Sequence, residues 1–201
     1  MKATRLLPLF GILAIALVVA ALTIGGETPD TDDPVAKLTA FYTANDSDIT
    51  ASSLLLMAAA AAFMAWAIQV RSLLFSSEGG PGTRATLGLV GAVIFAVGMT
   101  IFAGIGFALG DAPEKLDPAA LQALHVLSMD LFPPLAVGTV LTLFGNGLAV
   151  LKTRVFPAWL GWVSIVGALF AFTPVWFVPF LALGVLIVVS SVMLAMRSDA
   201  A

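Results

Sequence analysis

Residues 85–109 read ATLGLVGAVIFAVGMTIFAGIGFAL, an uncharged and almost wholly apolar stretch. Its length of about 25 residues corresponds to about 37 Å of α-helix, more than the roughly 30 Å hydrocarbon core of a bilayer. Apolar runs of similar character lie near 6–24, 50–70, 132–151, 157–173 and 176–196. The sequence does not show the repeated alternating ten-residue segments of a membrane barrel. We therefore predict an all-α fold, a polytopic transmembrane bundle of six spanning helices that forms a single domain over residues 1–201.

The composition supports a bilayer environment and narrows the chemistry. Hydrophobic residues make up 60% of the chain and charged residues 10%, with a mean hydropathy of +1.07. A soluble domain carries about 25% charged residues, so the composition excludes a water-soluble globule. The absence of cysteine excludes disulfides and Cys-ligated metals, and a single histidine excludes a multi-His metal site within one chain. No catalytic residue, metal ligand or cofactor is assigned, and no nucleic-acid partner is expected.

Lysine and arginine orient the predicted bundle, because cytoplasmic segments of membrane proteins carry an excess of them. With the N-terminus inside, the cytoplasmic side holds seven of the nine: Lys2, Arg5, Arg71, Arg84, Lys152, Arg154 and Arg197. Only Lys37 and Lys115 then lie outside, where most of the acidic residues also gather. Both termini are therefore predicted to be cytoplasmic.

The first apolar segment has two interpretations. Met1 to Arg5 form a basic start, and Ala20-Ala21 offers small residues for cleavage, as in a secretory signal peptide. The apolar run of about 19 residues is longer than the usual signal-peptide core of roughly 7 to 15, which favours an uncleaved helix. Cleavage would leave five helices and the same orientation for the rest of the chain.

Two predicted outer segments, 25–49 and 110–131, contain helix-start signals. Asp33-Pro34 and Asp117-Pro118 each resemble an N-cap residue followed by proline at the first helical position. Apolar residues then recur at helical spacing at Val35, Leu38, Phe41 and Tyr42. This pattern predicts a short amphipathic helix on the outer surface, before Asp48 caps the second span. A solvated acidic loop is the alternative.

A stripe of small residues predicts how the helices pack. In the third span it runs at four-residue spacing through Gly88, Ala92, Ala96, Thr100, Gly104 and Ala108. Small residues let helix backbones approach closely in lipid. We expect the stripe to pack against the alanine run 58–62 of the second span, which a short inner turn makes an antiparallel neighbour. A contact between two copies of the chain is the alternative.

The residues that could carry chemistry gather in 119–138, at His125, Asp130, Pro133 and Pro134. The prolines remove the helical partners of two carbonyls beside Asp130, which could form a small oxygen-lined cation or proton site. The interpretation that we favour is that Asp130 caps the helix that begins near Pro133, or that it faces the water outside. His125 lies five positions before Asp130, about 140° around a helix, so the two do not form a ready-made dyad.

Other polar and aromatic residues have structural interpretations. Asn146, between Gly145 and Gly147, is expected to form an interhelical hydrogen bond. Trp159, Trp162 and Trp176 are expected at the membrane boundaries, where tryptophan is enriched.

Part of the sequence resembles a known group of proteins. Residues 155–162, VFPAWLGW, follow a basic turn, and 41–45, FYTAN, precede a span. Together with the 125–134 stretch, they resemble small multi-pass membrane proteins of unknown function that are common in actinobacteria. The resemblance implies a location in the bacterial plasma membrane and carries over no catalytic residue.

Three classes of function stay open from the sequence. A non-enzymatic accessory, sensor or scaffold is favoured, with the lipid bilayer and a membrane-protein partner or a second copy of the chain around it. The alternatives are a small-solute, proton or ion permease that uses Asp130 at the Pro133-Pro134 break, and a membrane-embedded enzyme. Ionisable residues are scarce in the predicted spans, which argues against both alternatives.

Overall fold

The computed structural model describes residues 9–111, 113–173, 175 and 177–198, and the regular structure in these ranges is entirely helical. Its elements in chain order are α1 (Phe10–Gly25), α2 (Val35–Ala44), α3 (Asp46–Glu78), α4 (Thr83–Asp111), η3 (Pro113–Lys115), α5 (Pro118–Asp130), α6 (Phe132–Thr153), α7 (Ala158–Leu169), η4 (Phe170–Phe172) and α8 (Val178–Ser198). The prediction of an all-α bundle is confirmed.

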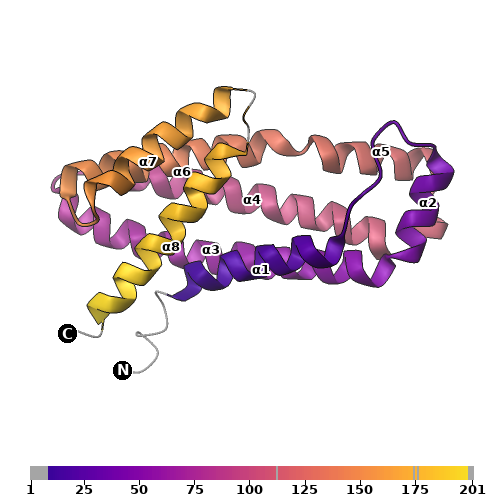
Figure 1. The fold of residues 1–201 in the computed structure, drawn as a ribbon, viewed down its shortest axis with the longest axis horizontal. Coiled ribbons are helices and arrows are strands. Elements are labelled where there is room, and N and C mark those ends of the chain that lie inside the picture. Colours follow the sequence, from indigo (N-terminus) through magenta and orange to yellow (C-terminus); the bar gives the residue numbers. More distant parts are fainter. Residues whose placement is uncertain (1–8, 112, 174, 176, 199–201) are drawn as a thin grey trace.

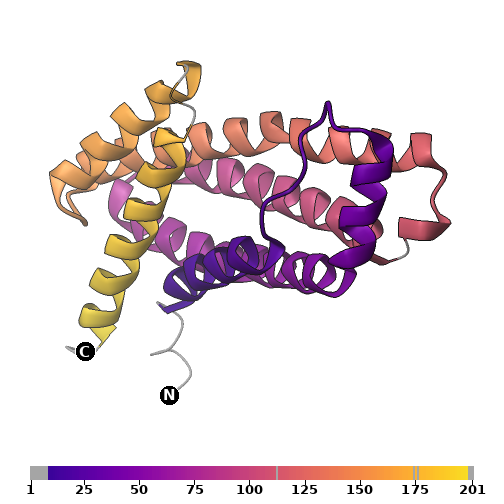
Figure 2. The same ribbon diagram turned by 45° about the vertical axis from the view of Figure 1, so that its right-hand side comes forward.

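The long helices run side by side along the longest axis of the molecule (Figure 1). α3 and α4 form an antiparallel pair, and α5 continues almost directly into α6. The inclined α7 and α8 cover only one half of this length, whereas α2 lies across the opposite end (Figures 1 and 2). Below, α2, η3 and α5 are called the cap, and the opposite end, which carries the α3–α4 and α6–α7 turns, is called the hairpin end.

Four helical stretches are long and apolar enough to cross a membrane, namely α3, α4, the α5–α6 pair and α8. The chain is therefore suited to a membrane-embedded position. α1 and α7 are apolar but shorter, with 16 and 12 residues, and α7 rises only about 18 Å. The predicted first span, 6–24, begins in residues that the structure does not describe.

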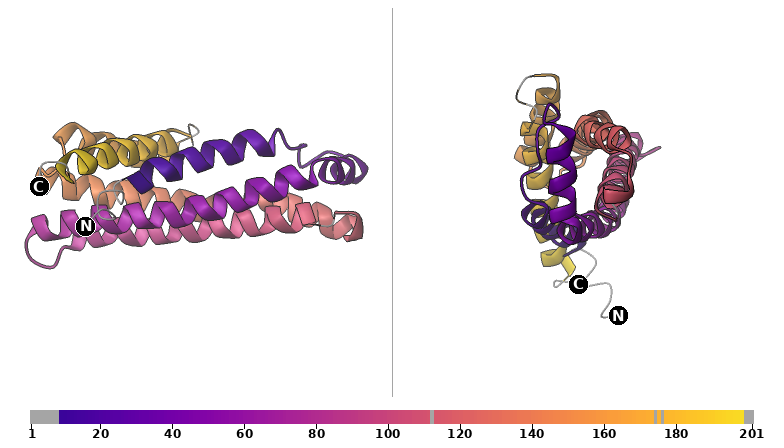
Figure 3. Two further views of the ribbon diagram at one scale, coloured as in Figure 1. Left: turned by 90° about the horizontal axis from the view of Figure 1, so that it is seen from below. Right: turned by 90° about the vertical axis from the view of Figure 1, so that its right-hand side faces the viewer.

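The longest helices exceed the thickness of a bilayer core. α3 has 33 residues and the α5–α6 pair 36, which corresponds to about 50 Å and about 54 Å. A hydrocarbon core of about 30 Å leaves a substantial part of both outside it. The view from below shows this elongated shape, and the view along the long axis shows the helices grouped side by side (Figure 3). Most of the 110–131 segment, predicted only as an outer connection with a helix start, is the helix that prolongs α6.

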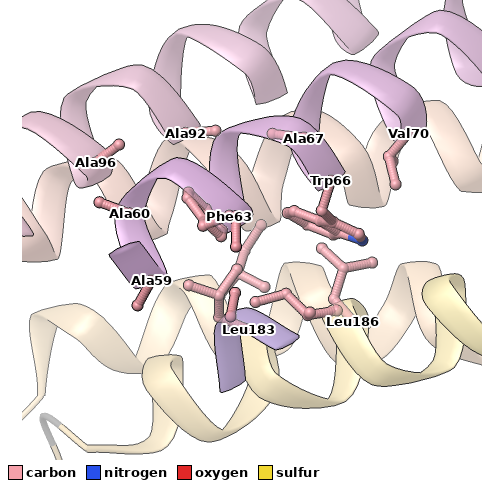
Figure 4. Close-up of a cluster of buried hydrophobic side chains, with 14 of the residues drawn as sticks. Ala59, Ala60, Phe63, Trp66, Ala67, Val70, Ala92, Ala96, Leu183 and Leu186 are labelled. Atoms are coloured by element: carbon pink, nitrogen blue, oxygen red, sulfur yellow. The ribbon is translucent and has the colours of Figure 1, made fainter. Parts of the chain in front are cut away.

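The main apolar core extends through α1, α3, α4, α6, α7 and α8, and its largest side chains lie between α3 and α8. Phe63 and Trp66 point from α3 toward Leu183 and Leu186 of α8 (Figure 4). Trp66 is 1% exposed, and its indole N–H donates a hydrogen bond to Ser190 Oγ of α8 at 2.9 Å. A buried polar group therefore fixes the pairing of α3 with α8 inside an otherwise apolar contact.

A second, smaller core lies under the cap. It contains Leu38 and Tyr42 of α2, Ile49 of α3, Leu109 of α4 and Leu121 of α5. The expected amphipathic helix after Asp33-Pro34 is thus present, and its apolar face packs on three other helices. This small core attaches α2 to the bundle.

The predicted packing of the small-residue stripe is wrong for half of its length. Gly88, Ala92 and Ala96 are buried, whereas Thr100, Gly104 and Ala108 are exposed. The cause is geometric. Each four-residue step advances about 40° beyond one turn, so the stripe rotates by about 200° between residues 88 and 108.

The buried part of α4 packs on α3, as predicted, and also on α6, where the two backbones approach closely. A Cβ on Gly145 of α6 would lie 2.3 Å from the backbone nitrogen of Gly88. A Cβ on Gly138 would lie 2.4 Å from the backbone nitrogen of Phe95. These glycines let the two backbones touch, as small residues do in membrane helix pairs. In the alanine run, Ala58 and Ala61 are exposed, whereas Ala59, Ala60 and Ala62 are buried in the same cluster as Ala92 and Ala96 of α4.

The helix starts agree only in part with the sequence signals. Asp117 caps α5 as predicted, because its carboxylate accepts from the Ala119 backbone N–H at 2.9 Å. Asp33 does not cap α2, whose N-cap is Pro34; it pairs instead with Lys37 at 2.6 Å. Asp48 does not cap the second span either, because α3 already begins at Asp46.

Glu78 closes the α3–α4 turn at the hairpin end. Its buried carboxylate accepts from the backbone N–H groups of Arg84 and Ala85, at 3.3 and 3.1 Å, and pairs with the Arg84 guanidinium at 3.0 Å. Gly79 and Gly80 have φ values of 69° and 72°, the left-handed conformation that glycine adopts without strain. The same turn therefore reverses the chain and satisfies N–H groups at the start of α4.

Tryptophan lies on the surface at the start of α7. Trp159 and Trp162 are 49% and 59% exposed, at the end of the molecule that carries Lys152 and Arg154. This placement agrees with a membrane-boundary position. Trp176 lies outside the described residues.

Candidate ligand-binding site beneath the cap

A buried hydrogen bond joins the two helices of the cap. Tyr42 Oη of α2 and His125 Nδ1 of α5 are 2.8 Å apart, and their rings meet edge to face with centroids 5.9 Å apart. Tyr42 is 2% exposed and His125 is fully buried. The sequence placed Tyr42 on an apolar helix face and His125 in the candidate site, and the structure brings the two together.

The chemistry of the pair assigns its protons. A neutral phenol is a stronger acid than a neutral imidazole, so we assign the Tyr42 O–H as donor to Nδ1 and the imidazole proton to Nε2. Burial raises the pKa of Tyr42 to about 12, which keeps the phenol protonated. His125 Nε2 is buried and has no hydrogen-bond partner among the described residues.

A cavity of about 190 Å³ lies beside Tyr42. We call it the cap cavity. Its walls come from the end of α1 and from α3, α4 and α5, and they include apolar side chains at Leu22, Leu56, Phe102, Leu109 and Met129. Its hydroxyl-bearing residues are Thr28, Tyr42, Ser52, Ser53 and Ser128. The cap cavity is therefore mainly apolar, with several hydroxyl oxygens.

A more open depression adjoins the cap cavity. It has a volume of about 420 Å³ and is lined by Phe102, Ser128, Met129, Leu131, Phe132 and Leu135. We call it the trough. Phe102, Ser128 and Met129 line both spaces, so the two are continuous along α4 and α5. The trough extends to the first turns of α6, where the long apolar run of this helix begins.

The serine hydroxyls of the cap cavity already donate their hydrogen bonds. Ser52 Oγ donates to Ala21 O of α1 at 2.9 Å. Ser53 Oγ donates to Ile49 O at 2.8 Å, and Ser128 Oγ to His125 O at 2.7 Å. A hydroxyl has one donor and two acceptor sites, so these oxygens retain only acceptor capacity.

The structure separates the residues of the candidate polar site that the sequence suggested. His125 is buried under the cap, whereas Asp130 is exposed at the last position of α5. The helix break is present: α5 ends at Asp130, and α6 begins at Phe132, with proline in its first turn. The favoured capping role of Asp130 is wrong, because the N-cap of α6 is Leu131 and no side chain bonds to it.

Asn146 lies far from this region, at the contact between α6 and α4. Its amide packs on Gly88, where an added Cβ would lie 2.8 Å from the side chain. The hydrogen bond of its Nδ2, however, goes to Thr142 O of its own helix at 2.9 Å. Asn146 thus sits in an interhelical contact, but the predicted hydrogen bond across it is replaced by one within α6.

Among the described residues, no charged side chain surrounds the cap cavity. Neither the cap cavity nor the trough is lined by Asp, Glu, Lys, Arg or His. Within the described ranges no three His, Cys, Asp or Glu side chains lie close enough to hold a metal. The arrangement suits the binding of an uncharged, largely apolar molecule.

Sequence reasoning missed most of the cavity residues. Ser52, Ser53 and Phe102 lie in apolar runs with no motif, and four helices must come together before they face one space. One feature of the sequence could have pointed to this region: the chain has a single tyrosine and a single histidine, and both lie in segments next to apolar spans.

Comparison with known protein families, curated proteins and solved structures finds no match for this chain.

Proposed function

We propose that the chain is a six-span protein of the bacterial plasma membrane, with both termini in the cytoplasm and the cap outside. In this proposal it is a non-enzymatic sensor or accessory protein that responds to a small apolar ligand bound beneath the cap. The ligand reaches the cap cavity from the membrane through the trough.

The distribution of charge supports this orientation. Among the described basic residues, the hairpin end carries Arg71, Arg84, Lys152, Arg154 and Arg197. The opposite end carries most of the acidic residues, in the 26–34 connection, the start of α3 and the α4–α5 connection. Excess Lys and Arg on the cytoplasmic side is the usual pattern of membrane proteins. The short α1 and α7 complete six spans if flanking residues or local bilayer thinning make up the remaining length.

The functional proposal rests on one observation: the walls of the cap cavity come from α2 and from helices of the bundle. Tyr42 comes from α2, whereas Ser53, Phe102 and Ser128 come from α3, α4 and α5. A ligand in the cap cavity contacts α2 and the bundle at once. Its binding energy therefore favours one position of α2 over others, which is the requirement for a ligand-controlled change.

The permease alternative receives less support. Its proposed carboxylate, Asp130, is exposed at the end of α5 and lines neither the cap cavity nor the trough. The half of the bundle toward the hairpin end is filled by the main apolar core around Trp66 and Leu186. An ion within this core would be surrounded mainly by apolar side chains, which is strongly unfavourable.

Thermal unfolding of the purified chain in detergent tests the proposal. Adding back a lipid extract of the source membrane is expected to raise the Tm of the wild-type protein. Ser53→Leu, which places a larger side chain into the cap cavity, is expected to abolish this rise. Ser77→Leu is the matched control, because Ser77 lies on the same helix but is exposed near the hairpin end. An equal rise in all three proteins, or saturable proton or cation flux in proteoliposomes, would contradict the proposal.

A further inference from the structure

We infer that the ligand of the cap cavity is a membrane lipid with an uncharged, hydroxyl-bearing head and one apolar chain. The inference rests on the proposed function and specifies its ligand. The head group of the lipid lies in the cap cavity among the serine oxygens, and its apolar chain lies in the trough.

The head group is uncharged because the site holds nothing to balance a charge. Of the described residues that line the cap cavity or the trough, only Tyr42 is ionisable, and its raised pKa of about 12 keeps it neutral. Burial of an unpaired charge among apolar side chains is strongly unfavourable. Phosphate, carboxylate and ammonium heads are therefore disfavoured.

The head group donates hydrogen bonds because the cavity mainly accepts them. The hydroxyls of Ser52, Ser53 and Ser128 already donate to backbone carbonyls, at 2.9, 2.8 and 2.7 Å. The last turn of α1 adds Leu22 and Gly25 to the lining, and the final carbonyls of a helix have no partners within it. A ligand with only ester or ether oxygens would bring acceptors against acceptors, whereas a hydroxyl supplies the missing donor.

The chain of the ligand follows from the shape of the trough. The trough begins at Ser128 and Met129, which it shares with the cap cavity, and continues along Phe132 and Leu135 of α6. These α6 residues open its apolar run, so the trough passes from the membrane boundary toward the hydrocarbon level. Its volume of about 420 Å³ falls within the roughly 300–1,000 Å³ of pockets that hold small molecules. A polar end at the boundary and an apolar end within the membrane match an amphiphile.

Binding of matched lipids to the purified full-length protein tests the inference. The first probe is monooleoylglycerol, which carries two hydroxyls, and methyl oleate has the same chain without a donor. Oleate and oleylamine carry the same chain with a negative or a positive head. Farnesol carries one hydroxyl on an isoprenoid chain. Comparing it with monooleoylglycerol shows whether the natural ligand is a prenol or an acylglycerol. We expect a hydroxyl probe to bind at least about tenfold more tightly than methyl oleate, as expected for one lost hydrogen bond to a buried acceptor.

A serine variant links this preference to the cavity. Ser53→Ala removes one acceptor and is expected to weaken the hydroxyl probe severalfold while leaving methyl oleate unchanged. Ser77→Ala is the matched control, because both serines lie on α3 and donate to the carbonyl four residues before them, at 2.8 and 2.9 Å. Each variant is compared with its own Tm without lipid, which separates binding from folding.

Several results would overturn the inference. The inference is wrong if methyl oleate, oleate or oleylamine binds as tightly as both hydroxyl probes. It is also wrong if Ser53→Ala leaves the preference for hydroxyl probes unchanged. If the membrane extract raises the Tm through the cap cavity but neither hydroxyl probe binds, the ligand class is wrong and the proposed function stands. If the extract has no effect that depends on Ser53, the proposed function fails as well.

Discussion

Tyr42 and His125, the only tyrosine and the only histidine of the chain, are hydrogen-bonded to each other across 83 positions of sequence. Both side chains are buried, and they come from the two α-helices of the cap. A buried polar pair of this kind stabilises one arrangement of its helices, because any other arrangement leaves its polar atoms unpaired. The position of α2 on the bundle therefore depends on this pair as well as on the small apolar core around it.

A double-mutant cycle measures this coupling. Tyr42→Phe and His125→Leu are each expected to reduce the free energy of unfolding by about 1–3 kcal/mol, since each leaves a buried partner unsatisfied. The double variant should lose less than the sum of the two, by about 0.5–3 kcal/mol. Thr39→Val serves as the control, because the Thr39 hydroxyl bonds only within α2. Strict additivity in detergent unfolding would show that the two side chains do not interact.

The raised pKa of Tyr42 predicts a pH dependence at the alkaline end. The folded phenol keeps its proton to about 12, whereas an unfolded tyrosine loses it near 10. Between these values the folded state binds more protons, so stability falls as the pH rises. The contribution is present in full below about pH 10 and is lost progressively by about pH 12.

Melting curves of wild type and Tyr42→Phe across this pH range check the prediction. The difference between the two proteins should shrink as the pH rises, because only the wild type carries the phenol. All other ionisable groups are common to the two proteins, so their contributions cancel in the difference. A difference that stays constant from pH 9 to pH 12 would place Tyr42 in contact with water.

The helices were largely predictable because apolar runs and cap signals are local. The run 85–109 lies within α4, and Asp117-Pro118 starts α5 where the sequence indicated. The near-continuous α5–α6 helix was not predicted, because Pro133-Pro134 indicated only a break. In the structure these prolines lie in the first turn of α6, where proline removes no helical hydrogen bond.

The packing was less predictable because it depends on which faces meet. A four-residue repeat of small residues rotates around its helix, and the sequence does not say where the stripe leaves the interior. The glycines of α4 that touch α6 include Gly88, Gly91 and Gly98, which do not follow the four-residue spacing. The Tyr42–His125 pair and the cap cavity could not be predicted either, because both arise from segments far apart in the chain.

Two glycine substitutions test the revised packing. Gly145→Ala is expected to destabilise the bundle by about 1–3 kcal/mol, because its Cβ would lie 2.3 Å from the Gly88 backbone nitrogen. Gly104→Ala should be neutral or slightly stabilising, since nothing lies within 4 Å of its Cβ and alanine favours helix. Equal unfolding free energies for the two variants would mean that α4 and α6 do not touch at Gly145.

Substitutions of two tryptophans test the contact between α3 and α8. Trp66→Phe removes the donor to Ser190 Oγ and is expected to lower the free energy of unfolding by about 1 kcal/mol or more. Trp162→Phe is the matched control, because Trp162 is 59% exposed and should tolerate the change. A larger loss of stability from Trp162→Phe would contradict the described core.

In the topology that we propose, the chain crosses the plasma membrane with the cap outside and the hairpin end in the cytoplasm. Single cysteines decide it most directly, because the chain has none of its own. Ser77→Cys and Asp111→Cys place a thiol at exposed positions, near the hairpin end and next to the cap. A membrane-impermeant thiol reagent added to intact cells is expected to label position 111, and to label position 77 only after permeabilisation. Labelling of position 77 in intact cells, with position 111 protected, would show that the chain has the opposite orientation.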